Sequence, residues 1–150
     1  MSEVSALEVG QQFITVYHRL RRLVDDAMTA AGLSLSRAKV LGELSAHGPM
    51  NQTALAGRLG FAPRSVTDTL DSLERDGLAE RSDDPSDRRA RIVAITAAGA
   101  EALATAMTTR AALFDQIFGV LDTPSRSQLL DLLRLIEGSL TSPSGGCNVG

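Results

Sequence analysis

The sequence predicts a mostly α-helical (α+β) fold in which a single β-hairpin lies among several helices. Over most of the chain the apolar residues recur every three to four positions, as they do on one face of a helix. After residue 77 this spacing gives way to a short alternation of apolar and polar residues, which is typical of a strand. Glycines that can end a helix and Ser, Asn or Pro residues that can begin one divide the helical part into separate segments.

Length and composition favour a single domain (1–150) with a core of its own. The formal net charge is −3, which argues against a general nucleic-acid coat protein but not against a local basic contact. No apolar run is long enough to span a membrane and the N-terminus lacks the pattern of a signal peptide, so we expect a cytoplasmic protein. The single cysteine, Cys147, excludes an internal disulfide and a zinc site made of cysteines.

Four helices are expected before the change of spacing. Each has an apolar stripe, and each begins or ends at a residue suited to that position. Their predicted extents are 4–31, with an apolar stripe from Phe13 and a stop at Gly32; 34–46, capped by Ser34; 50–60, capped by Asn51; and 62–77, with Pro63 in the first turn.

Two strands, 78–81 and 90–96, follow the fourth helix and are joined by a charged segment with Pro85 at its centre. Two strands joined by a polar turn form a hairpin. Thr96 can cap a long fifth helix, and Thr123-Pro124 starts a last one. The final residues, 141–150, are small and polar, and we expect them to be disordered.

This order of elements, a helix-turn-helix followed by a hairpin, predicts a winged helix-turn-helix lobe at 33–96. The flanking segments, 4–31 and 97–140, are long helices from opposite ends of the sequence. Apolar residues cover more than half the circumference of the last helix, so packing on one side cannot bury them all. A second copy of the chain can, and we therefore expect these helices to form the dimerisation region of a homodimer.

The fourth helix is expected to be the recognition helix of a DNA-binding lobe. At 100° per residue, Val66, Leu70 and Leu73 face the core and the charged residues face outward. Arg64 could then bind a guanine in the major groove, and Asp68 could accept from the N4 amino group of a cytosine or hold Arg64 in an i,i+4 pair. The predicted DNA contacts are Pro63, Arg64, Ser65, Thr67, Asp68, Ser72 and Arg75 on this helix, and Asn51, Gln52 and Thr53 at the start of the preceding one.

The alternative is that this face is only exposed to solvent and carries ion pairs within the helix, such as Asp71 with Arg75. Four acids between residues 68 and 76 would repel phosphates unless this end of the helix points away from DNA. The helix taken alone leaves both interpretations open.

The charged part of "DDPSDRRARIVAIT" (83–96) is interpreted as the tip of the wing. A narrow hairpin beside a major-groove helix projects toward the adjacent minor groove, whose negative potential attracts arginine. We predict that Arg88 enters that groove, that Asp87 and Arg89 brace one another, and that Arg91 meets a phosphate. The alternative is an exposed turn kept in solution by its mixed charge.

These segments together resemble the multiple-antibiotic-resistance regulator (MarR) family of transcription factors. The match rests on "LSLSRAKVLGEL" (33–44), on residues 50–103 and on the two closing helices, and "SVT..LDSLE..GL.ER....DRRA..V.IT..G" within it is a specific pattern. The resemblance implies a homodimer joined through its terminal helices, with two winged lobes on one palindromic operator in double-stranded DNA. It also implies a repressor that is released by a small ligand, often a phenolic or other aromatic anion, and in some members by oxidation.

The resemblance further implies an effector pocket where the first, second and fifth helices meet the lobe. Phe13, Tyr17 and Phe61 could line this pocket, with Arg21 or Arg22 pairing with an anion. The same aromatic residues could equally be ordinary core, and the same arginines solvated charges.

The chain departs from the family's pattern at several positions. Family members often carry Arg or another polar donor where this chain has Asp68, so their base preference cannot be transferred. Peroxide sensors carry a cysteine near the first helix, where this chain has none, and Cys147 is poorly placed for a redox role. Only His18 and His47 are available as histidine ligands, so neither a metal site nor a cofactor is expected.

Two other functional classes compete with a DNA-binding regulator. A protein–protein adaptor built on a winged helix would suit the acidic recognition helix and the negative net charge. An enzyme is not expected, because neither histidine has a nucleophile and an acid in a recognisable arrangement and the chain has no glycine-rich phosphate loop.

Overall fold

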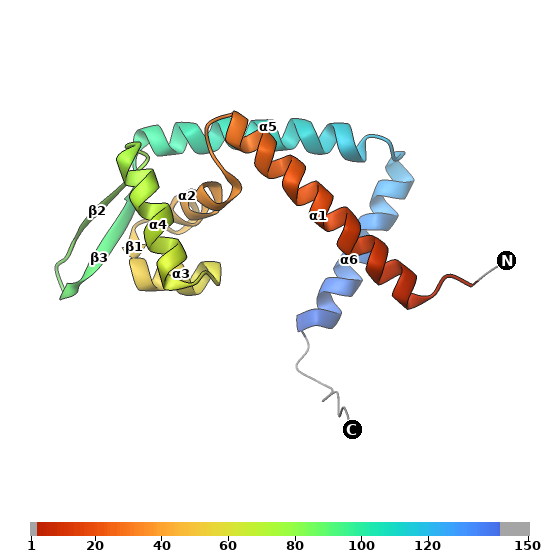
Figure 1. Cartoon of the computed structure of the whole chain (residues 1–150), viewed down its shortest axis with the longest axis horizontal. Helices are drawn as coiled ribbons and strands as arrows, with labels where there is room; N and C mark the ends of the chain where they lie inside the picture. The colour runs from red at the N-terminus through yellow and green to blue at the C-terminus, as the bar shows by residue number, and fades with distance from the viewer. Residues whose placement is uncertain (1–2, 142–150) are drawn as a thin grey trace, which may run out of the picture. The chain divides into compact units, whose positions relative to one another are not determined.

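The computed structural model of the chain describes residues 3–141. Within them the predicted fold class is confirmed: six α-helices accompany one small antiparallel sheet of three strands (Figure 1). The predicted disordered tail, 141–150, lies outside the described residues apart from Thr141, and so does Cys147. The elements are α1 (Ala6–Ala30), α2 (Leu35–His47), β1 (Met50–Asn51), α3 (Gln52–Leu59), α4 (Pro63–Arg75), β2 (Ala79–Asp84), β3 (Asp87–Ile95), α5 (Ala97–Phe118) and α6 (Thr123–Thr141).

The chain divides into two compact units, Met1–Ala112 and Leu113–Gly150, and the boundary falls within α5. The first unit holds α1 to α4, the sheet and most of α5. The second holds the end of α5 and α6. No helix in the described part of the chain is both long and apolar enough to cross a membrane.

The capping residues fix the helix boundaries, largely as predicted. The Ser34 hydroxyl accepts from the backbone N–H of Arg37, and the Asn51 side chain accepts from that of Thr53 (2.7 Å). Pro63 is the first residue of α4, where its missing N–H is no loss. Thr96 precedes α5, and its hydroxyl accepts from the backbone N–H of Gly99 (3.0 Å). Local capping chemistry therefore sets where these helices begin.

The first helix begins before its apolar stripe, which starts at Phe13: α1 begins at Ala6, within the predicted helical segment 4–31. Ser5 and Glu8 form a capping box: the Ser5 hydroxyl accepts from the backbone N–H of Glu8, whose carboxylate accepts from the backbone N–H of Ser5. This last bond lowers the pKa of Glu8. The box supports a helical start ahead of the apolar stripe.

The sheet is larger than the predicted hairpin. Met50 and Asn51, expected to belong to the third helix, instead form β1 and pair with Val93 and Ile92 of β3. The charged segment expected as a turn is mostly strand, since β2 runs to Asp84 and β3 starts at Asp87. Residues of the outer hairpin are largely exposed on both faces, so their strands carry no alternation of apolar and polar residues.

The core of the first unit lies between α2, α3, α4 and the sheet. In Figure 1 these helices gather beside the β2–β3 hairpin. The inward stripe predicted for α4, namely Val66, Leu70 and Leu73, is fully buried as expected. Other fully buried side chains around it are Leu33, Val40, Leu41, Leu44, Leu55 and Val93. This packing holds α4 by one face and leaves the opposite face to solvent.

The corner at which α4, the wing and α5 meet is tightly packed. The Thr96 hydroxyl donates to the carbonyl of Gly77 (2.6 Å), and the Thr96 N–H donates to the carbonyl of Leu78 (3.2 Å). Gly99 lies so close that a Cβ atom placed there would overlap the carbonyl oxygen of Leu78. The first turn of α5 is therefore fastened to the corner that follows α4.

Candidate nucleic-acid interface

The outward face of α4 carries a line of free charged side chains. Arg64, Asp68 and Arg75 are exposed and lie opposite the buried stripe of the helix. None of the three forms a hydrogen bond or ion pair with its side chain among residues 3–141. The i,i+4 pair of Arg64 with Asp68, one of the two roles considered for Asp68, is therefore not formed. Both groups remain available to an outside partner.

Two of the predicted contacts are occupied within the protein. The Gln52 side-chain amide donates to the Thr67 hydroxyl (2.8 Å), which in turn donates to the carbonyl of Pro63 (3.1 Å). This chain of bonds ties the start of α3 to the first turn of α4. Asn51 is likewise occupied as the cap of α3, whereas the Thr53 side chain is exposed. Gln52 and Thr67 thus fix how the two helices of the motif fit together.

Most of the acids on α4 are paired with arginines from other elements. Arg81 of β2 donates to Asp71 (2.5 Å) and to Glu74 (2.6 and 3.0 Å), and Arg37 of α2 donates to Asp76 (2.6 Å). The hydrogen bond with Glu74 is the main reason that the pKa of Arg81 is raised. These ion pairs remove much of the repulsion that the acids would exert on phosphates. We call the pairing of Arg81 with Asp71 and Glu74 the Arg81 clamp.

The Arg81 clamp corrects an expectation about α4. The alternative interpretation paired Asp71 with Arg75 one turn away, but the Asp71 carboxylate binds Arg81 of the neighbouring strand instead. Sequence reasoning missed Arg81 because the contact depends on how β2 returns along α4. The signal available was a lone arginine on the short strand directly after an acidic helix.

The tip of the wing is organised by two aspartates. Asp84 accepts from the hydroxyl (2.7 Å) and the backbone N–H (2.9 Å) of Ser86, and both bonds lower the pKa of Asp84. Asp87 accepts from the backbone N–H of Arg89 (2.9 Å), so the expected brace between these residues runs through the backbone. These bonds shape the turn without using an arginine side chain.

The arginines of the wing point to solvent. Arg88 and Arg89 are exposed, and the side chain of neither one has a hydrogen-bond or ion-pair partner among the described residues. Arg91 lies 3.4 Å from the Asp83 carboxylate, with both side chains largely exposed. Such an exposed pair contributes little and exchanges readily for another anion. All three arginines therefore remain accessible.

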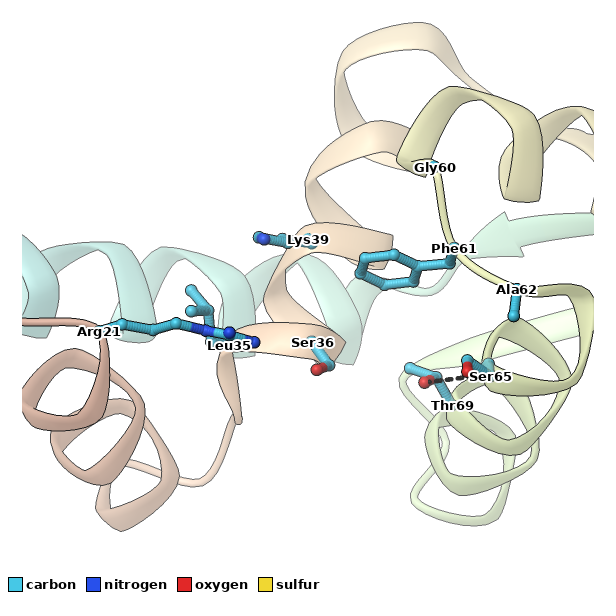
Figure 2. A pocket seen from close by; sticks show the side chains of 9 residues that line it. All are labelled: Arg21, Leu35, Ser36, Lys39, Gly60, Phe61, Ala62, Ser65 and Thr69. Carbon is cyan, nitrogen blue, oxygen red and sulfur yellow. Dashed lines mark hydrogen bonds between the residues drawn. The ribbon is translucent and has the colours of Figure 1, made fainter. Parts of the chain in front are cut away.

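A cavity lies beside the first turns of α4, with a volume of about 310 Å³. Figure 2 shows Phe61 reaching from the turn before α4 toward α2, where the Lys39 ammonium lies 5.9 Å from the centre of its ring. Arg21 of α1 also lines the cavity, as do Ser36, Ser65 and Thr69. Of the predicted effector residues, the structure brings Arg21 and Phe61 together here, whereas Arg22 does not line this cavity. Phe13 and Tyr17 do not line this cavity and are each about half exposed on α1.

Comparison with known proteins gives consistent matches. Residues 33–90 match the model of the MarR family. The uncharacterized HTH-type transcriptional regulator YhbI from Bacillus subtilis is 27% identical over 150 residues, which cover 98% of this chain and 95% of that protein.

Solved structures match over most of the chain as well. Wild-type apo MarR from E. coli has a TM-score of 0.78 at 22% identity, over 90% of this chain and 98% of that chain. A cysteine-to-serine mutant of MarR from E. coli, solved in complex with operator DNA, has a TM-score of 0.72 at 22% identity over 85% and 92% of the two chains. These likenesses agree with the winged helix-turn-helix arrangement described above.

Proposed function

We propose that this chain, whose residues 33–90 match the model of the MarR family, is a homodimeric repressor that binds a palindromic operator in double-stranded DNA. The observation that carries the proposal is the distribution of charge in the lobe. Arg64 and Arg75 on α4, and Arg88 and Arg89 on the wing, are free, whereas Asp71, Glu74 and Asp76 are paired. Free arginines on a recognition helix and on the neighbouring wing suit the major and the minor groove respectively.

The homodimer is supported by apolar surface on both terminal helices. On α1, Leu7, Phe13 and Ile14 are each about half exposed or more, and on α6 the same holds for Leu132 and Leu135. Faces of this kind are expected to be buried against a partner. A two-fold dimer would place its recognition helices about 34 Å apart, to meet successive major-groove faces.

Release by a small ligand is supported by the cavity next to α4. Two cations, Arg21 and Lys39, and one aromatic ring, Phe61, border a cavity that has no acidic residue in its lining. This set suits a small aromatic anion. Such a ligand would shift the dimer away from its DNA-binding arrangement only by binding the two arrangements unequally.

The test is titration of the full chain with a duplex taken from the region upstream of its own gene. We expect binding by a dimer at low salt, with an affinity that falls steeply as salt is raised because phosphate contacts release counterions. A protein–protein adaptor would show no duplex affinity at any salt concentration, and that result would overturn the proposal. Addition of aromatic carboxylates to the preformed complex tests release. If the complex is unchanged by aromatic carboxylates at millimolar concentrations, release by such a ligand is ruled out, whereas the proposed binding of DNA stands.

A further inference from the structure

The position and charge of Asp68 point to a role in reading the operator sequence. We infer that the Asp68 carboxylate accepts a hydrogen bond from the N4 amino group of a cytosine in the major groove, and so selects the base at that position. This inference rests on the proposed binding of DNA.

Asp68 differs from the other acids near it because its charge is not neutralised. Asp71 and Glu74 share Arg81, and Asp76 binds Arg37. Asp68 forms no hydrogen bond or ion pair with the rest of the described chain. A carboxylate that stabilised the helix would be expected to use Arg64 one turn away, which is equally free. The structure thus leaves Asp68 without an internal role.

The location of Asp68 places it at the centre of the DNA-facing surface. It lies opposite Val66, Leu70 and Leu73, which anchor α4 in the core. Arg64 precedes it by about 6 Å along the helix axis and Arg75 follows by about 10 Å. The two arginines offset the repulsion between one carboxylate and the phosphates, so an acid can be tolerated between them.

The chemistry of the major groove decides which base this carboxylate can accept. An ionised carboxylate has acceptors only, whereas guanine presents N7 and O6 acceptors and thymine an O4 acceptor at the groove edge. Adenine offers its N6 amino group, but beside the N7 acceptor, which would face the second carboxylate oxygen. Cytosine offers the N4 donor alone. Asp68 therefore favours cytosine and rejects guanine and thymine most strongly.

The neighbouring contact makes the inference more specific. If Arg64 binds a guanine through O6 and N7, the cytosine read by Asp68 lies within one or two base pairs of it, since the two side chains are one helical turn apart. The half-site should therefore contain a guanine and a cytosine at fixed spacing. One substitution at residue 68 should change only the second of them.

The experiment is selection from a randomised duplex library with the full-length dimer. Wild type is compared with Asp68→Ala, Asp68→Asn and the control Glu101→Gln. Glu101 is an exposed acid on α5 with no hydrogen-bond or ion-pair partner among the described residues, so E101Q changes the net charge equally without touching α4. Circular dichroism checks that each variant folds, which we expect because residue 68 is exposed.

We expect wild type and E101Q to require a cytosine at one position of each half-site. D68A should lose about tenfold of that discrimination while keeping the preferences elsewhere, and should bind random duplex more tightly than E101Q. D68N should shift the preference to adenine, because an amide can donate to N7 and accept from N6. If D68A and D68N keep the wild-type preference at every position, the inference is wrong although DNA binding stands. If wild type enriches no sequence, the proposed function itself fails, and the inference with it.

Discussion

The winged lobe and the terminal helices of this chain are stabilised in different ways. In the lobe, Leu55 and Leu70 are fully buried within a single copy of the chain. On α1, by contrast, Leu7 is 69% and Ile14 56% exposed, and on α6 Leu135 is 73% exposed. Each large apolar side chain contributes about 2 kcal/mol when it is buried. The lobe therefore has its core already, whereas the terminal helices still lack much of theirs.

The polar contacts follow the same division. In the lobe they join different elements, as Arg81 joins β2 to α4 and Gln52 joins α3 to Thr67 of α4. On α6, the ion pair of Arg134 with Asp131 (3.8 Å) joins residues of a single helical turn. Bonds between different elements fix a tertiary arrangement, and bonds within one helical turn do not. The lobe is thus a preformed binding unit, and the terminal helices carry the surface expected to join two such units.

Removal of α6 tests the role of the terminal helices and should give the largest effect of the three changes. We expect a chain that ends at Asp122 to run as monomers or aggregates on size-exclusion chromatography, because the apolar face of α6 is lost. Its operator affinity should fall by about a hundredfold, since two linked lobes gain at least that much avidity over one. A chain that ends at Thr141 is the control and should behave as wild type. A well-behaved dimer without α6 would contradict this division of roles.

Gly99→Ala should give the next largest effect, this time where the start of α5 meets the lobe. The added methyl group would overlap the carbonyl oxygen of Leu78, so the start of α5 must move away from the corner after α4. We expect a loss of about 2 kcal/mol in the free energy of unfolding, measured by urea denaturation.

Gly57→Ala is the matched control for that substitution. Gly57 lies within α3 with open space around its Cα, so an alanine there should raise the free energy of unfolding by about 0.5 kcal/mol. Equal stability of G99A and wild type would show that the corner is less tightly packed than the structure indicates. Loss of the dimer in G99A, with the lobe still folded, would show that the two regions depend on each other.

The parts of the fold that were predictable from sequence are those fixed by local signals. Ser34, Asn51 and Pro63 mark helix starts by their own capping chemistry, and the stripe of α4 is visible from its period alone. β1 was not predictable, because two residues become a strand only by pairing with β3. The length of the wing could not be predicted from sequence, because its outer strands are exposed on both faces and therefore lack an alternation of apolar and polar residues.

The candidate sites show the same limit. The outward line of Arg64 and Asp68 could be placed from helical geometry, but the Arg81 clamp could not, since it depends on the path of β2 along α4. In the predicted effector pocket, Phe13 and Arg21 both come from α1. They are nonetheless about 12 Å apart along the helix axis, which is too far for one small cavity. The spacing of apolar residues in the sequence locates a face of a helix. Tertiary packing decides which part of the helix lines a cavity.

Arg88→Ala should give the smallest of the three effects, and it separates the two regions most cleanly. We expect operator binding in a gel-shift titration to weaken by somewhat more than tenfold, or about 1.4 kcal/mol, because a minor-groove contact is lost. The dimer should remain intact on size-exclusion chromatography, since Arg88 is exposed at the tip of the wing. Arg91→Ala on the same strand is the comparison, and it should cost less because Arg91 already shares its charge with Asp83. Unchanged binding by R88A would refute the assignment of Arg88 to the minor groove and leave Arg89 as the residue to test at the wing tip.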